Sequence, residues 1–497
     1  MKRLGSATLE FLTPDVRAYS YDRTVAPRVV HIGVGGFFRS HIASYFDVMN
    51  GVGSDVWMIS GASLKTRRLV DALAAQDGLF THVTRSVEGK SIRLIRSVAC
   101  AVPPAAGYQT LIQQLSDTLV SVVTLTVTEK GYGLNPVTGE LDSANLDVLN
   151  DLTSPATPKS PLGILIAALD QRFKAGDSPF TVLPCDNVAQ NGNKIRKAMM
   201  ELAGARSAAL RSWLNDHGSF PSTMVDRITP TVSAEQIDSL AAQIGVQDQA
   251  AIFTEPFSQW VIERRGAGAL PPLELAGVRW VDEISVWEKL KLRTLNAAHS
   301  AMAYLGGLAG YRYVHEVVSL EVFRWYLRAL WRETASDIAI SDQELAGYLE
   351  ALEERFLNTA LPHDLYQIAT DGSQKLPPRL VSSIVTRLEA GLSVRASNWA
   401  VAAWIVWQRG MTETGGVFKV NDPLSERTAQ IVKSSDHVRS LARDLLHITD
   451  IFGDTAERYP GWASEVSHLV QRLVQAGTVA CIDQFLAESQ SQSGTMT

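Results

Sequence analysis

The stretch VVHIGVGGFFRSH, residues 29–41, decides the fold that this sequence predicts. Its first four residues, three of them β-branched and apolar, are typical of a buried strand, and a helical pattern follows the glycines. Gly33 permits a tight turn, and Gly35 lets backbone N–H groups approach a pyrophosphate at the positive end of the next helix. Phe38 stands where the usual fingerprint has a third glycine. The stretch predicts a dinucleotide-binding turn; the alternative is a tight turn that binds nothing.

The end of the second predicted strand, residues 56–60, bears on the choice of cofactor. A carboxylate about 20 residues after the glycines usually holds the ribose 2′-hydroxyl of NAD. The sequence offers Ser63, Lys65 and Arg67 there instead, a composition that would accept the 2′-phosphate of NADP. The alternative is that these cations are the solvated start of a helix. We expect NAD or NADP, contacted by these three residues and by the loop residues Gly33, Gly35, Gly36, Phe37 and Arg39.

The first half of the chain alternates strand and helix patterns around this stretch. Further strands are expected at residues 56–60, 119–127 and 180–183, and helices at residues 66–75 and 163–175. This alternation predicts a parallel sheet with crossover helices. Residues Ser160 and Pro161 form an N-cap and first-turn pair that opens one of these helices.

The pattern changes at about residue 286, where apolar residues begin to recur at helical spacing. The expected helices cover residues 316–335, 342–356, 382–389, 401–408 and 437–447. We therefore predict an α/β protein with an added all-α part. Residues 1–285 would form a doubly wound, Rossmann-type NAD(P)-binding domain, and residues 286–497 a mostly helical substrate and catalytic domain.

Composition excludes several classes of function. The 497 residues are 46% hydrophobic and 20% charged, as in ordinary globular proteins, and the net charge of -6 argues against nucleic acid or an anionic membrane as the main partner. Three widely spaced cysteines fit a reducing cytoplasm. The first 15 residues lack a signal-peptide core, and the apolar run 399–407 is shorter than the roughly 20 residues that span a bilayer. We expect small-molecule partners; the oligomeric state is not predicted.

The apolar segment 288–305 carries three polar side chains that could take part in catalysis: Lys291, Asn296 and His299. Burying them costs free energy unless each has a partner or a task. On a regular α-helix His299 lies about 80° and Asn296 about 140° from Lys291, so all three fit on one broad arc. An amine, an amide and an imidazole on one arc suit the oxidation of a carbinol, with a desolvated lysine as the base. The alternative is that Lys291 extends its amine to solvent, Asn296 bonds backbone groups, and His299 is a core histidine whose hydrogen bonds are satisfied.

Two further polar clusters follow the third and fourth predicted strands. Glu129 lies in the first cluster, and Asp186 and Asn187 lie in the second. Ligands of open parallel sheets bind beyond the carboxyl ends of the strands, so these side chains are expected near one ligand. Cys185 is not expected to be a nucleophile, because no Cys–His pattern accompanies it. No metal site is expected, because the ten histidines are scattered and HExxH is absent.

Taken together, these segments resemble the polyol-specific long-chain dehydrogenase/reductase family, which includes mannitol 2-dehydrogenase, fructuronate reductase and arabinitol dehydrogenase. The resemblance covers nearly the whole chain in family order. The matching pieces are HIGVGGFFRSH (31–41), QDGLFT (76–81), TLTVTEKGYG (124–133), PCDNVAQNGN (184–193), TMVDRITP (223–230), EPFSQWVIE (255–263), KLKLRTLNAAHSAMAYLG (289–306) and DGSQKLPPRL (371–380).

The resemblance implies a Rossmann-type domain, a helical domain and metal-free chemistry with a lysine base. Lys291 corresponds to that base, and Asn187 and Asn296 correspond to the two amides that hold the reacting oxygen. His299 corresponds to the histidine that positions the substrate hydroxyl, and Glu129 to the acid that relays the proton towards solvent. Asp186, which precedes one of these amides, is expected to contact the cofactor.

Substrate contacts implied by the resemblance are Asp226 and Lys375, and we add Gln367 and Arg379 as candidates. Mannitol dehydrogenases can carry an arginine where Gln367 falls, and residues 367–377 look more like the fructuronate-reductase branch. We expect an NAD(P)-dependent oxidoreductase of the mannitol 2-dehydrogenase type that interconverts D-mannitol and D-fructose. The alternatives are a fructuronate reductase, another polyol dehydrogenase such as one for arabinitol, and, from a different class, a non-catalytic NAD(P)-binding redox sensor.

Overall fold

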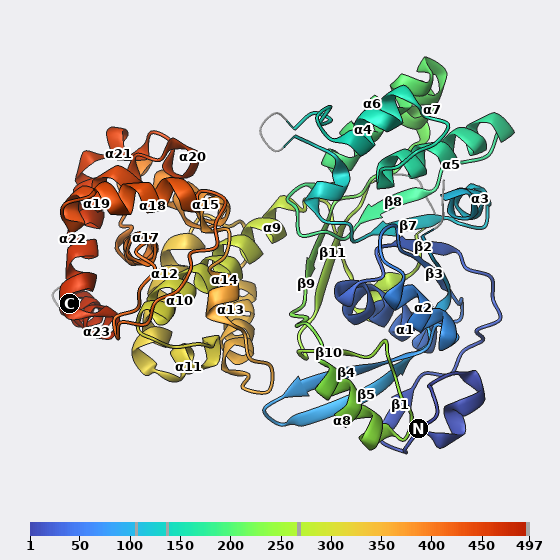
Figure 1. Ribbon diagram of the computed structural model, residues 1–497, viewed down its shortest axis with the longest axis horizontal. Coiled ribbons are helices and arrows are strands. Elements are labelled where there is room, and N and C mark those ends of the chain that lie inside the picture. The colour runs from blue at the N-terminus through green and yellow to red at the C-terminus, as the bar shows by residue number, and fades with distance from the viewer. Residues whose placement is uncertain (105–107, 136–138, 266–269, 494–497) are drawn as a thin grey trace. The chain divides into compact units, whose positions relative to one another are not determined.

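The computed structural model describes residues 1–104, 108–135, 139–265 and 270–493 (Figure 1). Its contacts divide the chain into two compact units, unit 1 at Met1–Ser285 and unit 2 at Val286–Thr497. Unit 1 combines three sheets with helices, and no strand of the described sheets belongs to unit 2. The predicted fold class, a Rossmann-type α/β part followed by a mostly helical part, is therefore confirmed.

A five-stranded parallel sheet forms the centre of unit 1. Its strands, in spatial order, are β6 (Val98–Val102), β3 (Ile59–Ala62), β2 (Val29–Ile32), β7 (Val122–Leu125) and β8 (Thr181–Pro184). The chain order runs outward in both directions from β2, so the strand order reverses between β2 and β7. Such a reversal opens a crevice at the carboxyl ends of the two strands.

The second strand of this sheet begins later than residues 56–60 would predict. Trp57 does not join the ladder, because its backbone N–H and C=O bond to the side chain of Asn50 at 2.8 and 3.0 Å. The strand therefore starts at Ile59 and extends to Ala62. The extension carries the sheet up to Ser63, one of the predicted cofactor residues.

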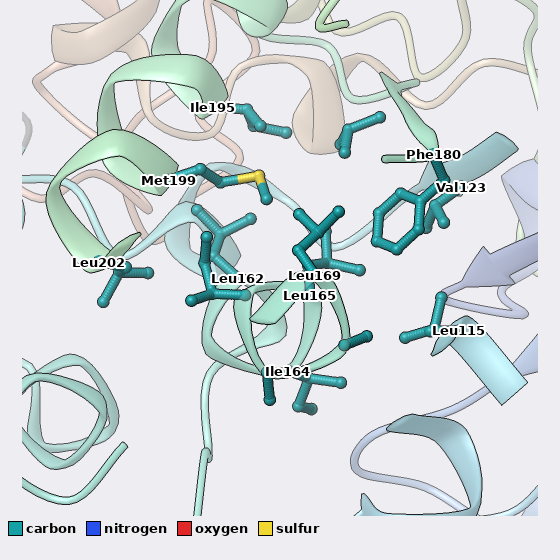
Figure 2. Close-up of a cluster of buried hydrophobic side chains, with 14 of the residues drawn as sticks. Leu115, Val123, Leu162, Ile164, Leu165, Leu169, Phe180, Ile195, Met199 and Leu202 are labelled. Carbon is teal, nitrogen blue, oxygen red and sulfur yellow. The ribbon is translucent and has the colours of Figure 1, made fainter. Parts of the chain in front are cut away.

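Helices cover the central sheet and bury its apolar side chains. Leu162, Leu165 and Leu169 of α5 lie in one cluster with Val123 of β7 and Phe180 (Figure 2). The predicted start of α5 is confirmed, since Ser160 Oγ accepts a bond from Gly163 N at 2.9 Å. The helices and helical turns of unit 1 are η1 (Ser6–Phe11), η2 (Phe38–Ile42), α1 (Ala43–Val52), α2 (Arg68–Ala75), α3 (Gln109–Ser116), η4 (Glu129–Tyr132), α4 (Leu146–Thr153), α5 (Pro161–Ala175), α6 (Asn191–Arg206), α7 (Ala208–His217), α8 (Ala234–Ile244) and η5 (Leu273–Ala276).

Two smaller sheets of unit 1 were not predicted. One has the order β1 (Val16–Ala18), β5 (Gly89–Ile95), β4 (Phe80–Ser86) and β10 (Ile252–Thr254); the other has β12 (Arg279–Val281), β11 (Gln259–Glu263) and β9 (Thr223–Asp226). Most of these strands are short or carry polar residues on one face, so they lack the continuous apolar run of a central parallel strand. Their partners are also distant in sequence, as in the pairing of β4 with β10.

Unit 2 is built around two apolar helices, α10 and α17, which pack against each other, and α17 also packs against α22. Trp399 and Trp404 of α17 are buried. The helices of unit 2 are α9 (Ser285–Lys291), η6 (Leu292–Asn296), α10 (Ala297–Leu308), α11 (Val314–Ser319), α12 (Glu321–Thr334), α13 (Asp342–Leu357), α14 (Leu365–Ile368), α15 (Gly372–Leu376), η7 (Pro377–Val381), α16 (Ser382–Glu389), α17 (Arg395–Trp407), α18 (Ser425–Ser434), α19 (Val438–Leu446), α20 (Thr449–Phe452), α21 (Thr455–Arg458), α22 (Pro460–Ala476) and α23 (Thr478–Ser493).

Two expectations about helices in unit 2 were wrong in detail. The helix expected over residues 316–335 is two helices, because Leu320 has an extended backbone between α11 and α12. The apolar segment 288–305 is not a regular α-helix either. A π-helical segment, η6, separates α9 from α10, and such wide turns are frequent at functional sites.

Candidate active site

The glycine loop of unit 1 leaves β2 at the point where the strand order reverses. Gly33 has a φ of +111°, and a Cβ added there would stand 2.3 Å from the carbonyl oxygen of Thr126, which follows β7. Thr126 Oγ1 also donates to Gly33 O at 2.7 Å. Glycine is therefore required at residue 33 both by backbone conformation and by space.

His31 supports the glycine loop through hydrogen bonds and a ring contact. Its ring nitrogens lie 2.7 Å from Thr124 Oγ1 and 2.9 Å from Thr126 Oγ1, and its ring stacks on Phe38 at 4.0 Å between centroids. Burial lowers the pKa of His31 to about 3, so the ring is neutral at neutral pH. Phe38, which replaces the third fingerprint glycine, is thus a stacking partner for His31. No local sequence pattern predicts this support.

Arg39 supports the same loop through backbone carbonyls. Its side chain is buried and donates to Gly35 O at 3.3 Å, to Ala251 O at 3.0 Å and to Ala250 O. Burial lowers its pKa to about 10, which leaves the guanidinium charged at neutral pH. These contacts tie the glycine loop to the segment before β10. A direct contact between Arg39 and the cofactor stays a prediction.

The glycine loop leaves open space at Gly35 and Gly36, where a bound pyrophosphate would approach the backbone. A Cβ added at Gly35 would meet no atom within 4 Å, and one at Gly36 would meet only ordinary contacts, the nearest at 3.5 Å. Phe37, beside them, stacks on His41. The described residues of this loop therefore fit a dinucleotide, with Gly35 as the position of closest approach.

At the end of β3, the predicted cofactor residues differ in exposure. Ser63 is buried, and its Oγ accepts a bond from Thr66 N at 3.3 Å. Lys65 and Arg67 are exposed, and Arg67 pairs with Asp71 at 3.6 Å on α2. Both cations are thus available to a phosphate on the ribose, while their exposure also fits the solvated helix start named as the alternative.

The polar cluster after β8 is partly buried and lies against the segment that follows β7. Asp186 is buried and accepts a bond from Thr128 N at 2.7 Å. Burial raises the pKa of this carboxyl group, against the backbone hydrogen bonds that lower it. Asn187 is exposed. Burial also raises the pKa of Cys185, which disfavours a thiolate nucleophile there.

Two predicted site residues, Glu129 and Asp226, and one that was not predicted, Asn191, belong to neighbouring segments. Glu129 begins η4, but its side chain lies outside the described part of the structure. Asp226 is buried at the end of β9. Asn191 was missed within the quoted motif. Its amide nitrogen donates to Asp186 O at 3.1 Å and to Thr223 O at 3.0 Å, so it joins the segment after β8 to the start of β9.

In unit 2, the π-helical segment η6 places Lys291 and Asn296 at its two ends. Asn296 is buried, whereas Lys291 is partly exposed, so the expectation of a fully buried lysine was wrong. Two side chains from other helices bond backbone carbonyls of this wide turn. Trp331 Nε1 donates to Thr294 O at 3.1 Å, and Arg379 Nη1 donates to Asn296 O at 3.3 Å. No local sequence pattern predicts these two contacts.

Cationic side chains surround His299. Its Nε2 atom is buried and has no hydrogen-bond partner among the described residues, and its ring meets the ring of His363 edge-on at 5.9 Å. Burial lowers the pKa of His299 well below its usual value, and His363, Arg379, Arg355 and Lys375 lower it further. A neutral imidazole with a free ring nitrogen can bond a substrate hydroxyl.

Three predicted substrate residues lie near this histidine or on the neighbouring segment. Arg379 also donates to Ser300 Oγ at 3.0 Å, and burial lowers its pKa to about 10. Lys375 donates to Ile368 O at 3.2 Å, and burial together with Arg379 lowers its pKa to about 8. Gln367 is exposed on α14. Unit 2 therefore brings together Asn296, His299, Lys375 and Arg379.

Two properties of the described residues bear on other classes of function. They contain no group of three or more His, Cys, Asp or Glu side chains that could hold a metal ion. They also contain no helix with the length and hydrophobicity needed to cross a membrane.

Comparison with known proteins assigns both units to one family. Residues 27–274 match the mannitol dehydrogenase Rossmann domain, and residues 283–474 match the mannitol dehydrogenase C-terminal domain. The chain is 37% identical to the uncharacterized oxidoreductase YeiQ of Escherichia coli, over 96% of this chain and 98% of the relative. It is 35% identical to the D-mannonate oxidoreductase of Escherichia coli, over 92% and 95% of the two chains.

A solved structure agrees over nearly the full length. Pseudomonas fluorescens mannitol 2-dehydrogenase, in ternary complex with NAD and D-mannitol, is 32% identical with a TM-score of 0.84, covering 98% of this chain and 99% of that one. The earlier resemblance to the polyol-specific dehydrogenases is thereby confirmed. The chain belongs to the mannitol dehydrogenase family of polyol dehydrogenases.

Proposed function

We propose that this protein is an NAD(P)-dependent oxidoreductase that interconverts a secondary alcohol of a polyol with the matching ketose, with D-mannitol and D-fructose as the first candidate pair. The observation that carries the proposal is the set of polar groups on the η6 and α10 segment of unit 2. Lys291, Asn296 and His299 supply an amine, an amide and a neutral imidazole within nine residues of one helical run.

The residues of unit 2 divide the proton chemistry among them. Lys291 accepts the proton of the substrate hydroxyl during oxidation and returns it during reduction, which requires its neutral form in the first direction. Asn296 donates a hydrogen bond to the oxygen as negative charge develops on it, where a fixed donor is most effective. His299 holds the hydroxyl through its free ring nitrogen. Asn187 has the same role as Asn296 by the family resemblance, and Glu129 the role of proton relay.

The cofactor would be held by the glycine loop of unit 1, with Gly35 at the pyrophosphate. NAD or NADP, when bound, supplies the acceptor and donor of hydride. Lys65 and Arg67 are exposed where a 2′-phosphate would need a cation, which supports use of NADP beside NAD. The chain's own contribution here is a rigid loop, since His31 and Arg39 fix its backbone.

A second candidate is a sugar acid of the mannonate and fructuronate type. The cations Arg355, Lys375 and Arg379 all lower the pKa of His299. A site of this charge favours a substrate that carries a carboxylate. The relative that is a D-mannonate oxidoreductase supports the same candidate.

Comparing Lys291→Ala with Lys289→Ala tests the proposed base. Lys289 is an exposed lysine two residues away on α9, so its loss removes the same charge without touching the proposed chemistry. We expect Lys291→Ala to lower turnover by about 10²–10⁴-fold while NADH binding is retained. Lys289→Ala should retain normal turnover. Normal turnover in Lys291→Ala would refute the proposed base.

The substrate is identified by following absorbance at 340 nm with mannitol, fructose, mannonate and fructuronate, each with NAD(H) and NADP(H). The first candidate predicts turnover of the neutral pair, and the second predicts preference for the acid pair. A wild-type protein that binds NADH but turns over no member of the panel would instead support the redox-sensor alternative.

A further inference from the structure

A pocket of about 430 Å³ lies on the polar side of the four-stranded sheet in unit 1. It contains none of the residues assigned above to the cofactor or to the proton chemistry. Its lining includes three arginines and one histidine, together with hydroxyl-bearing side chains. The lining residues on which the argument rests are Arg17, His82, Thr84, Ser91, Arg93 and Arg227.

The register of the sheet explains why these side chains converge. Arg17 of β1 pairs with Arg93 of β5, and Arg93 pairs in turn with His82 of β4. Paired residues on adjacent strands point to the same face. The opposite face carries the alternate residues Val83, Ile92 and Leu94, which are buried in the core. The sheet is thus apolar on one face and carries a row of basic side chains on the other.

Arg227 adds a cation from outside the sheet, just beyond the end of β9. Its Nη1 donates to Ser40 O at 2.8 Å and its Nη2 to Glu255 O at 3.2 Å, while Nε has no partner among the described residues. Burial lowers its pKa to about 10, so it keeps its charge at neutral pH. The guanidinium is therefore fixed in place with one donor unused.

His82 supplies the observation that points to a ligand. It is 3% exposed, and its Nε2 atom has no hydrogen-bond partner among the described residues. Burial lowers its pKa well below the usual value, and Arg227 and Arg93 lower it further. A buried ring nitrogen of this kind costs free energy unless a ligand or a water molecule bonds it.

The positive charge of the pocket is only partly balanced. Arg93 lies 3.5 Å from the buried carboxylate of Asp47 and donates to Ser44 Oγ. The carboxylate of Glu255 accepts a bond from Ile228 N at 2.7 Å. Arg17 is exposed and has no hydrogen-bond or ion-pair partner among the described residues. The carboxylates of Asp47, beside Arg93, and of Glu255, which acts on Arg227, are two charges against three guanidinium groups.

We propose that this pocket binds a phosphate group. Guanidinium groups from two strands and one loop, with an imidazole between them, suit an anion that accepts hydrogen bonds on several oxygens. The volume exceeds the needs of inorganic phosphate, so the site has room for a small phosphorylated metabolite. The pocket lining contains none of the residues proposed for the redox chemistry, so phosphate binding can be measured independently of Lys291.

The test is calorimetric titration of the full-length protein with inorganic phosphate and, separately, with fructose 6-phosphate, at constant ionic strength set by chloride. Arg17→Gln removes a pocket charge from an exposed side chain, so the variant should fold. Arg3→Gln is the matched control, because Arg3 is equally exposed and its side chain makes no contact with the pocket. His82→Phe replaces the imidazole with an apolar ring, which removes the unpartnered Nε2 together with the ring nitrogen that bonds the Ser40 backbone.

We expect saturable phosphate binding that weakens about tenfold in Arg17→Gln, as for the loss of one charge-assisted contact, and is unchanged in Arg3→Gln. His82→Phe should weaken binding as well. Tighter binding of fructose 6-phosphate than of inorganic phosphate identifies a phosphorylated metabolite as the ligand; equal binding identifies the free ion. Absence of saturable binding for both ligands, or equal loss in Arg17→Gln and Arg3→Gln, overturns the proposal.

Discussion

Gly35→Ala separates the role of the glycine loop in folding from its role in binding. A Cβ at residue 35 meets no atom within 4 Å, and Gly35 is absent from the glycines of positive φ. The substitution should therefore leave stability unchanged or raise it by about 0.4–1 kcal/mol, through lower entropy of the unfolded chain. The new methyl group would nevertheless occupy the space where a pyrophosphate approaches the backbone.

The size of the binding loss follows from the contacts displaced. Moving the pyrophosphate away from one backbone N–H forfeits a charge-assisted hydrogen bond of about 1.5–3 kcal/mol, which is about a 10–150-fold loss in NADH affinity. The measurement is a fluorescence titration with NADH, accompanied by thermal unfolding without cofactor. Gly347→Ala on α13 is the control, since a Cβ there also meets no atom within 4 Å.

Gly33→Ala gives the opposite expectation. A Cβ there would stand 2.3 Å from Thr126 O at a φ of +111°, so we expect a loss of at least about 2 kcal/mol in the free energy of unfolding. If Gly35→Ala binds NADH with wild-type affinity, the loop does not hold the pyrophosphate and the reasoning fails. If Gly35→Ala instead unfolds the protein, the space above residue 35 is not open as described.

The remaining predictions concern unit 2 and the absence of a metal requirement. Burial and Arg379 lower the pKa of Lys375 to about 8, so its positive charge is present below that pH and is lost as pH rises through it. The KM for an anionic substrate should therefore rise between about pH 7 and pH 9 in the wild type and not in Lys375→Arg, and parallel profiles would contradict this. Trp331→Phe removes the donor to Thr294 O and should lower the free energy of unfolding by about 1–3 kcal/mol in urea titrations; a change below about 0.5 kcal/mol would show that the carbonyl finds another partner. Chelation should leave turnover within about twofold of its original value, and activity lost to a chelator and restored by zinc would contradict the lysine mechanism.

The local sequence was sufficient to predict the central strands and the loop between β2 and η2. The run 29–32, with three β-branched residues around His31, predicted β2 at its observed bounds, because a strand buried on both faces is rich in such residues. The helix 382–389 was likewise predicted at its observed bounds. Lys291, Asn296 and His299 were also visible in the sequence, since polar groups in an apolar helix require a reason to be there.

Contacts between distant segments decided the rest. The small sheets form by pairing residues far apart in the chain, such as His82 with Ile252, which no local pattern encodes. The π-helical turn η6 depends on Trp331 and Arg379 to bond its carbonyls, and both lie on other helices. The sequence by itself determined the elements and the reactive groups of this protein. Only the tertiary structure decided which groups are supported, buried or left with a free donor, because those properties are set by neighbours brought in from elsewhere in the chain.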